Sequence, residues 1–285
     1  MISNASIEVG SIKLSAISAK RDDGPILANI IALPGGGHTS RYWHHPAKPD
    51  ASLLALGASL GYNVVAFDRP GYGTSSNLVD GGFTLISQID ILKGAISQVC
   101  AASGAPEVFL VGHSMGGILS IMLAASGSIP GLLGLDVSGV PFQFSDDLRI
   151  ALSNEEQTNA SHSARSLFYG PGGTFDASIF QFDNLSTASV RRNELDDSIL
   201  WPSLFPSIAS KVEVPVQYTL AEYDLTTPVD EATFAMVRDY FANSPRIETR
   251  QQMASGHNTS LHHVARAYHL RAIAFFDEIL AAHLS

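Results

Sequence analysis

The sequence predicts an α/β fold in which a mostly parallel β-sheet is covered by helices on both faces. Short apolar or alternating runs, typical of β-strands, occupy residues 5–9, 12–18, 27–33, 63–67, 107–111, 131–137, 214–220 and 246–253. Stretches with apolar residues at helical spacing separate many of these runs, at about 50–60, 83–102, 115–126, 229–242 and 260–283. Strands that alternate with helices in this way are typical of parallel sheets.

The individual runs differ in ways that place them in this sheet. The first two runs have no helix between them, so they predict a pair of strands that precedes the strand–helix alternation. The runs NIIAL, NVVAF and VFLVG lack polar alternation and predict central strands that are buried on both faces. The last helical stretch has the clearest pattern, with Val264, Tyr268, Phe275 and Ile279 on one side.

Residues 141–211 interrupt the alternation. This segment has no strong strand signal, several Ser/Asp/Asn clusters and the turn sequence YGPGGTF. It is rich in aromatic residues, namely Phe142, Phe144, Phe168, Tyr169, Phe175, Phe180, Phe182, Trp201 and Phe205. We therefore expect residues 1–140 and 212–285 to form the α/β core, and residues 141–211 to form a helical cap beyond the strand C-termini, where such sheets bind ligands. The alternative is a helical excursion with a small core of its own.

The composition favours a globular protein that binds neither nucleic acid nor anionic membranes. The 285 residues carry a formal net charge of −10, 45% of them are hydrophobic, and the basic residues form no block. The single cysteine, Cys100, allows no internal disulfide and is compatible with a reducing compartment. The N-terminus lacks the pattern of a signal peptide, and no run approaches the ~20 apolar residues of a membrane span. We expect a cytoplasmic location, and the sequence carries no signal for the oligomeric state.

The sequence Gly112-His113-Ser114-Met115-Gly116 predicts a nucleophilic serine. This G-x-S-x-G pattern follows the strand VFLVG and precedes the helix-like stretch GILSIMLAAS, the context that a nucleophile elbow requires. A strand that turns directly into a helix strains its central residue, which is tolerated only when the neighbouring residues are small. Ser114 is then exposed at the sheet edge, near backbone N–H groups that favour negative charge. The alternative is a glycine-rich turn with an incidental serine.

A serine nucleophile needs a histidine base that a carboxylate orients. For this motif the expected chain order is serine, acid, histidine. Asp224 lies in the turn after VPVQYTL, and His257 lies in the loop after RIETRQQMASG, so both follow strand C-termini at the edge where Ser114 emerges. We expect the side chain of His113 to point elsewhere and pack. The alternatives are Asp136 and Glu222 for the acid, and His262 and His263 for the base.

Two backbone N–H groups are expected to bind the oxyanion of an acyl-transfer reaction. One is the amide of Met115, the residue after the nucleophile. The other comes from Pro34-Gly35-Gly36-Gly37-His38, whose glycines let the main chain approach a ligand closely. We choose Gly36, with Gly37 as the second choice. A nucleotide-binding loop is poorly supported because no lysine or G-K-[ST] sequence follows.

With these three loops placed, the sequence resembles the α/β-hydrolase superfamily over nearly its whole length. The resemblance rests on Pro34-Gly35-Gly36-Gly37, FDRPGYGTSS, GHSMGG, AEYD and GHN. In the segment DRPGYGTSS, Asp68 and Arg69 are expected to stabilise the loop between strand and helix near the site. The resemblance implies an eight-stranded sheet, a lid inserted after the sixth strand, and a triad of Ser114, Asp224 and His257.

We therefore expect a serine hydrolase that cleaves an ester, lactone or thioester of a hydrophobic or aromatic small molecule through an acyl-enzyme, which water then hydrolyses. The residues expected to bind this substrate are Gly35, His38, Tyr42, Trp43, Phe142, Phe168 and Trp201. We expect no cofactor, and no metal because the paired His44 and His45 lack a third ligand at suitable spacing. The alternatives are a C–C bond hydrolase or a cofactor-free lyase or oxygenase on the same scaffold, and a non-catalytic small-molecule binding protein.

Overall fold

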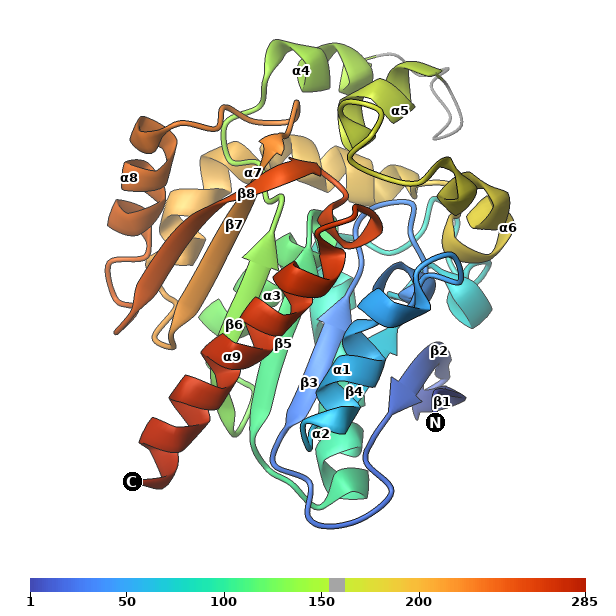
Figure 1. Cartoon of the computed structure of the whole chain (residues 1–285), viewed down its shortest axis with the longest axis vertical. Helices are drawn as coiled ribbons and strands as arrows, with labels where there is room; N and C mark the ends of the chain where they lie inside the picture. The colour runs from blue at the N-terminus through green and yellow to red at the C-terminus, as the bar shows by residue number, and fades with distance from the viewer. Residues whose placement is uncertain (154–161) are drawn as a thin grey trace.

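One β-sheet with helices on both faces forms the centre of the molecule (Figure 1). The computed structural model describes residues 1–153 and 162–285. In these residues the sheet has eight strands in the order β1-β2-β4-β3-β5-β6-β7-β8. The strands are β1 (Ser3–Val9), β2 (Ile12–Ala19), β3 (Asn29–Leu33), β4 (Asn63–Phe67), β5 (Val108–His113), β6 (Leu132–Ser138), β7 (Val216–Tyr223) and β8 (Ile247–Gly256).

The direction of the strands confirms the predicted α/β class with one refinement. β1 pairs with β2, and β2 with β4, in antiparallel orientation. The remaining neighbours, from β4 through β8, pair in parallel. The sheet is therefore mixed, and its antiparallel part lies at the N-terminal edge.

The helices lie where the spacing of apolar residues predicts them, and the segment between β6 and β7 adds further ones. α1 and α9 cover one face of the sheet, whereas α2, α3, α7 and α8 share a hydrophobic core on the other face. The helices are α1 (Leu53–Ser59), α2 (Leu85–Ser103), α3 (Met115–Ala125), α4 (Asp146–Ser153), α5 (His162–Tyr169), α6 (Asp183–Ser186), α7 (Arg192–Ala209), α8 (Glu231–Tyr240) and α9 (Ala265–Leu284).

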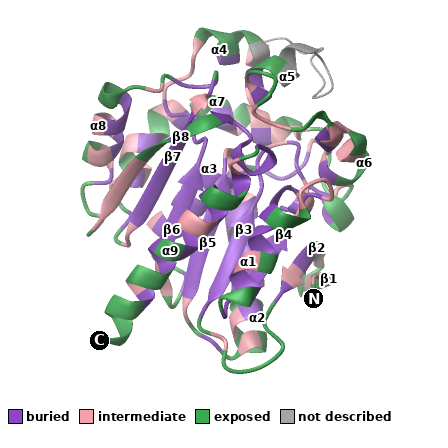
Figure 2. Cartoon of the chain, in the orientation of Figure 1, coloured by how far each residue is buried: buried purple, intermediate pink, exposed green. Residues whose placement is uncertain are grey.

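The central strands send alternate side chains into two hydrophobic cores. On β3, Ile31 and Leu33 pack on the side of α2 and α3, whereas Ile30 and Ala32 pack on the side of α1 and α9. Because helices cover both faces, every residue of β3, β4 and β5 is buried (Figure 2). Burial on both sides explains why these strands are continuous apolar runs in the sequence.

Residues 141–211, the segment expected to form the cap, connect β6 to β7 and contain α4 to α7. In Figure 1, α4 and α5 lie above the carboxyl ends of the strands. α7 instead packs on α2, α3 and α8, and its residues Trp201 and Phe205 belong to the same hydrophobic core as Ile118 of α3. Within this segment α7 therefore belongs to the main core, whereas α4 and α5 lie above the carboxyl ends of the strands.

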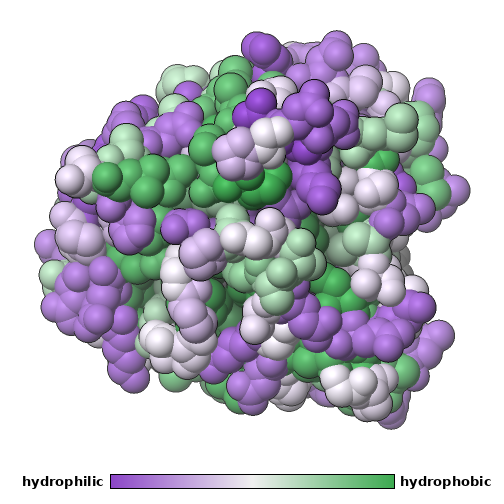
Figure 3. Space-filling view, turned by 90° about the horizontal axis from the view of Figure 1, so that it is seen from below, coloured by the Kyte–Doolittle hydropathy of each residue, from purple (hydrophilic) through white to green (hydrophobic). Residues whose placement is uncertain are grey.

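Nowhere in residues 1–153 and 162–285 does a helix combine the length and the apolarity that crossing a bilayer requires. Seen from below, at the end away from α4 and α5, hydrophilic and apolar side chains are intermixed (Figure 3). Exposed apolar side chains at this end are thus interspersed with polar ones.

Candidate active site

Ser114 forms the sharp turn between β5 and α3. Its backbone has φ 51° and ψ −118°, and in the described residues Ala254 is the one other non-glycine residue with positive φ. This conformation is costly for a residue with a Cβ atom. The neighbours are glycines for a steric reason: a Cβ atom on Gly112 would lie 2.6 Å from the carbonyl oxygen of Gly116, and one on Gly116 would overlap the carbonyl of Leu33. The turn holds Ser114 half-buried at the start of α3.

Asp224 and His257 meet at the carboxyl ends of β7 and β8. The His257 Nδ1 atom lies 2.9 Å from Oδ2 and 3.1 Å from Oδ1 of Asp224. Asp224 is 5% exposed and His257 is 2% exposed. Since an ionised carboxylate only accepts hydrogen bonds, Nδ1 of the neutral imidazole carries the proton and Nε2 keeps a lone pair. This is the tautomer that a general base needs.

Thr226 fixes the carboxylate that faces His257. Its backbone N–H and its hydroxyl donate to Asp224 Oδ1 at 2.9 Å and 2.6 Å. Burial alone would raise the pKa of Asp224, but the His257 imidazole and the two Thr226 donors outweigh burial, so the pKa is lowered. Asp224 therefore stays ionised and oriented toward the imidazole.

The alternative acids have other partners. Asp136, on β6, accepts hydrogen bonds from the Tyr268 hydroxyl at 2.7 Å and from Gln217 Nε2 at 2.9 Å. It is fully buried beneath α9, and burial raises its pKa to about 6 despite these donors. Glu222 accepts a hydrogen bond from the N–H of Ala254 at 2.7 Å. Of the three acids, Asp224 is the one that hydrogen bonds the imidazole of His257 within the described ranges.

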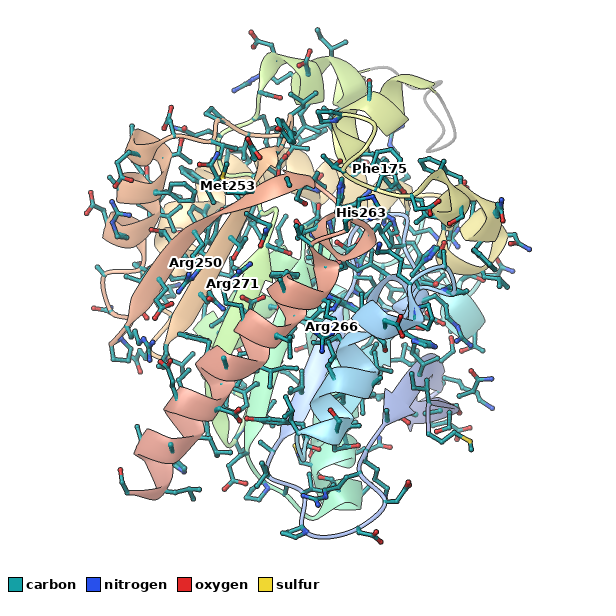
Figure 4. The ribbon with its side chains drawn as sticks, in the orientation of Figure 1. Phe175, Arg250, Met253, His263, Arg266 and Arg271 are labelled. Carbon is teal, nitrogen blue, oxygen red and sulfur yellow. The ribbon has the colours of Figure 1, made fainter. Side chains whose placement is uncertain are left out.

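The alternative bases also lie apart from the Asp224 carboxylate. His262 is buried, with Nδ1 3.1 Å from the Thr174 hydroxyl. His263 is exposed in the turn before α9, beside Phe175, and its N–H donates to the Thr174 carbonyl at 2.9 Å (Figure 4). These two histidines tie the start of α9 to the loop around Thr174.

His113 packs behind the elbow, as expected. Its ring stacks on Tyr42 with a centroid distance of 4.8 Å and an interplanar angle of 10°. Its Nε2 atom lies 3.1 Å from Asn258 Oδ1, and its Nδ1 atom lies 3.1 Å from the Ser138 hydroxyl. Because an amide oxygen only accepts, Nε2 is the donor and Nδ1 accepts from Ser138. His113 therefore supports Asn258, the residue that follows His257.

Ser114 and His257 lie in the same small region of the molecule. The ring of His113, the neighbour of Ser114, has its centroid 4.8 Å from that of His257. A Cβ atom on Gly139 would lie 2.9 Å from Cε1 of both rings, and the N–H of Ser114 donates to the carbonyl of Ser138 at 2.8 Å. In the described residues no hydrogen bond joins Ser114 Oγ to His257 Nε2. In free enzymes this bond is often long and tightens when substrate binds.

The loop after β3 lies against the elbow. A Cβ atom on Gly35 would be 3.3 Å from Cβ of Ser114, and one on Gly36 would be 3.3 Å from Cγ of Met115. The N–H of Gly37 donates to the Tyr72 hydroxyl at 3.3 Å. By contrast, neither the Gly36 nor the Met115 N–H has a hydrogen-bond acceptor in the part of the chain that the structure describes. The arrangement leaves these two amides available to an incoming oxygen.

His38, at the end of the same loop, is a buried and neutral histidine. Its Nδ1 atom lies 3.3 Å from the carbonyl oxygen of Gly36, so Nδ1 is the donor and Nε2 carries a lone pair. Nε2 has no hydrogen-bond partner in the described residues. Burial lowers the pKa of His38 to about 4. The described residues contain no group of three or more His, Cys, Asp or Glu that could hold a metal ion.

The aromatic residues expected at the substrate site fall into two groups. Phe168 of α5 is partly exposed, and its ring centroid lies 5.4 Å from that of His257. The others are at most 4% exposed and belong to the two hydrophobic cores, namely Tyr42, Trp43, Phe142 and Trp201. Phe142 and Trp201 both pack on Phe205, at 5.1 Å and 5.3 Å between centroids. Phe168 is thus the aromatic residue of this set that contacts the candidate base.

Thr226 and Glu194 hold this site together, although neither belongs to a catalytic motif of the sequence. Thr226 follows Asp224 by two residues, and a hydroxyl at that spacing after an aspartate is a recognisable turn signal. Glu194 of α7 forms a buried ion pair with Arg69, and Arg69 Nη2 donates to the carbonyl of Gly35 at 3.1 Å. No local pattern connects Glu194 to Arg69, which is 125 residues away in the chain.

The chain has relatives of known family and fold. A family model described as "Alpha/beta hydrolase family" matches residues 30–274. The magnesium-chelatase 30 kDa subunit of Rhodobacter capsulatus is 26% identical over 130 residues, which cover 46% of this chain and 40% of that protein. Esterase Rv0045c of Mycobacterium tuberculosis is 33% identical over 127 residues, which cover 45% of this chain and 37% of that protein. The chain therefore spans less than half the length of these curated relatives.

Solved structures resemble the whole chain. The crystal structure of a highly thermostable carboxyl esterase from Bacillus coagulans, in complex with glycerol, matches with a TM-score of 0.75 at 17% sequence identity. The match covers 98% of this chain and 99% of that chain. At this level of identity the likeness is one of fold.

Proposed function

The chain belongs to the alpha/beta hydrolase family, and on that premise we propose that it is a serine hydrolase acting on an ester or a related acyl bond. The observation that carries the proposal is the contact of His257 Nδ1 with the Asp224 carboxylate, on the loops after β7 and β8. This pair supplies an oriented base to the sheet edge at which Ser114 forms an elbow. Similarity to a mycobacterial esterase supports the same class of reaction.

In the first half of the proposed reaction, Ser114 Oγ attacks the carbonyl carbon of the substrate while His257 Nε2 takes the proton of the Ser114 hydroxyl. Asp224 stabilises the imidazolium that forms, and it stays ionised itself. The amides of Met115 and Gly36 donate to the oxyanion of the tetrahedral intermediate. When the intermediate collapses, the bond to the leaving oxygen breaks and His257 gives its proton to that oxygen. Alcohol leaves, and an acyl group remains on Ser114.

In the second half, water replaces the alcohol. His257 Nε2 takes a proton from water as the water oxygen attacks the acyl carbon, and the same two amides hold the second oxyanion. The bond to Ser114 Oγ then breaks, and His257 returns the proton to the serine. The carboxylic acid leaves, and no other reactant is consumed.

We further propose that α4 and α5, in the segment 141–211, form a cap that confers a preference for apolar acyl groups. The carbonyl of Phe168 accepts a hydrogen bond from the Asn258 N–H at 3.0 Å, so α5 is joined to the loop that carries His257. Close packing supports this junction, because a Cβ atom on Gly256 would lie 2.5 Å from the backbone of Tyr169. The Phe168 ring beside His257 and the neutral imidazole of His38 favour an uncharged substrate.

Labelling with a fluorophosphonate tests the proposal, because this reagent reacts with an activated serine and leaves a stable adduct. We expect mass spectrometry of the digested protein to place the adduct on Ser114, and we expect labelling to be lost in Ser114→Ala and strongly slowed in His257→Ala. We expect the wild type to hydrolyse members of a panel of p-nitrophenyl esters, aryl esters and lactones. Ser114→Ala should hydrolyse none of them.

Two results would overturn the proposal. A wild type that hydrolyses none of these substrates and takes up no label would favour a binding protein. A Ser114→Ala variant with unchanged turnover would favour a reaction that does not pass through an acyl-enzyme. Preference for charged or sugar esters over apolar ones would refute the substrate class and leave the serine mechanism in place.

A further inference from the structure

A buried glutamate lies behind the loop that carries Gly36. Glu194 is in the first turn of α7, and its side chain is fully buried, as is that of Arg69, with which it forms an ion pair. Its second oxygen, Oε2, accepts a hydrogen bond from the Tyr72 hydroxyl at 2.6 Å. Gln88 Nε2 lies 3.3 Å from the first oxygen, Oε1. The carboxylate needs these donors, because an unpaired buried charge is strongly destabilising.

The partners of Glu194 extend to the loop after β3. Arg69 Nη2 donates to the Gly35 carbonyl at 3.1 Å, and the Tyr72 hydroxyl accepts from the Gly37 N–H at 3.3 Å. A tyrosine hydroxyl has one proton, and Glu194 takes it, so the Tyr72 oxygen is left as an acceptor for Gly37. Glu194 therefore makes the Tyr72 oxygen the acceptor for Gly37. The Arg69 guanidinium can only donate, and the ion pair with Glu194 holds it beside the Gly35 carbonyl.

The contact made by Arg69 bears directly on the N–H of Gly36. The Gly35 carbonyl and the Gly36 N–H belong to one planar trans peptide group, so they point in opposite directions. A guanidinium that holds the carbonyl oxygen therefore fixes the direction of the N–H. Its positive charge also polarises the peptide group, which makes the N–H a stronger donor.

The start of α7 is anchored to the core, so Glu194 is held in place. The N–H of Asn193 donates to the Gly81 carbonyl at 3.0 Å, and Asn193 Nδ2 donates to the Gly82 carbonyl at 2.7 Å. One turn later, Asp197 Oδ2 accepts from the N–H of Leu85 at 2.7 Å. Asn193 therefore fixes the residue that precedes Glu194, whereas Asp197 joins the next turn of α7 to the first residue of α2.

We propose that Glu194 is a positioning residue that, through Arg69 and Tyr72, orients the Gly36 amide toward the oxyanion. The inference rests on the proposed function, because it takes the Gly36 N–H as an oxyanion donor. Glu194 does not touch the substrate. Without its charge, Arg69 loses the ion pair and keeps the neutral Gln88 oxygen, 3.1 Å from Nη1, as a partner. The guanidinium is then held less firmly on the Gly35 carbonyl, and the Gly36 N–H turns away. Such a change weakens binding of the transition state more than binding of the substrate.

The test is the variant Glu194→Gln, assayed with a p-nitrophenyl ester. Removal of one oxyanion donor costs about 100- to 1,000-fold in kcat, and Glu194→Gln misdirects the donor without removing it. We therefore expect kcat to fall about 10- to 100-fold and KM to stay within about twofold. The Ki of a trifluoromethyl ketone, whose hemiketal places an oxyanion in the same position, should rise in parallel with the loss in kcat/KM. If Glu194 only stabilised the fold, the Ki would not rise in proportion to the loss in kcat/KM.

Two further variants separate orientation from stability. Asp197→Asn, on the same helix, weakens another bond between α7 and the core without touching the oxyanion loop, and should leave kcat within about twofold. The double variant Arg69→Met with Glu194→Met replaces the buried pair by apolar groups and should keep the protein folded. Its kcat should stay as low as that of Glu194→Gln, because the Gly35 carbonyl has still lost its donor.

These experiments separate failure of the positioning role of Glu194 from failure of the proposed serine hydrolase activity. If fluorophosphonate labels Ser114 in the wild type and Glu194→Gln keeps its kcat, the positioning role is overturned and the serine hydrolase stands. Recovery of kcat in the folded double variant would likewise overturn it. A wild type without label or esterase activity would overturn both. Loss of kcat with a parallel rise in Ki, and no such loss in Asp197→Asn, supports the inference.

Discussion

Replacing Asp224 with asparagine changes which proton His257 carries. The Thr226 N–H and hydroxyl both donate to Oδ1, at 2.9 Å and 2.6 Å, so the amide oxygen of an asparagine must take that position. The amide NH2 then occupies the position of Oδ2, 2.9 Å from His257 Nδ1, and donates to it. His257 Nδ1 becomes the acceptor, its proton moves to Nε2, and the imidazole cannot take a proton from Ser114.

The size of this effect follows from the known cost of the wrong tautomer. The same substitution in a serine protease triad lowers kcat about 10⁴-fold, which corresponds to about 5.5 kcal/mol of transition-state stabilisation. We expect a similar loss in kcat/KM of Asp224→Asn toward a p-nitrophenyl ester, without loss of folding in a thermal melt. Asp136→Asn is the matched control, because it alters a buried aspartate that binds Tyr268 and Gln217 instead of His257.

Two results would contradict the role of Asp224. One is an Asp224→Asn variant that keeps more than about one tenth of wild-type kcat/KM. The other is an Asp136→Asn variant that loses more activity than Asp224→Asn while remaining folded. The second result would indicate that Asp136 on β6, and not Asp224, is the acid of the triad.

Three further predictions concern the elbow, a buried acid and the pocket. Gly116→Ala places a methyl group against the carbonyl of Leu33 on β3, so urea titration should show a free energy of unfolding lower by about 2–3 kcal/mol. Gly172→Ala is the control and should cause no such loss, because a Cβ atom there would meet nothing within 4 Å. The folded pKa of Asp136 is raised to about 6, so native protein holds an extra proton between about pH 4 and 6. Wild-type stability should therefore fall relative to Asp136→Asn as pH rises through this window, by about 2–3 kcal/mol, and a constant difference would contradict this. Phe168→Ala should raise KM for long-chain p-nitrophenyl esters more than for acetate, and equal effects on both would refute its role in the pocket.

Several parts of the molecule follow from local sequence signals. The elbow could be predicted because Gly112 and Gly116 are required by close contacts that any strand-to-helix turn of this type makes. β3 and β5 could be predicted because burial on both faces leaves no polar alternation. Asp224 and His257 could be proposed as partners because both follow strands that end at one edge of the sheet.

Other parts depend on contacts that no local signal reports. Aromatic content marks Phe142 and Trp201 as apolar residues, but it does not indicate whether they face a pocket or pack on Phe205 in the core, which is where the structure has them. The insertion of β4 between β2 and β3 depends on tertiary pairing. The ion pair between Arg69 and Glu194 links residues of two distant segments, so neither residue predicts the other.

The central claim is that Ser114, His257 and the amides of Met115 and Gly36 converge on one reacting carbonyl group. A crystal structure of the fluorophosphonate adduct tests this most directly. We expect the phosphorus on Ser114 Oγ, a phosphonyl oxygen about 3 Å from both amide nitrogens, and His257 Nε2 within hydrogen-bonding reach of the adduct. A phosphonyl oxygen that points away from both amides, or an imidazole that remains out of reach of the adduct, would contradict the account.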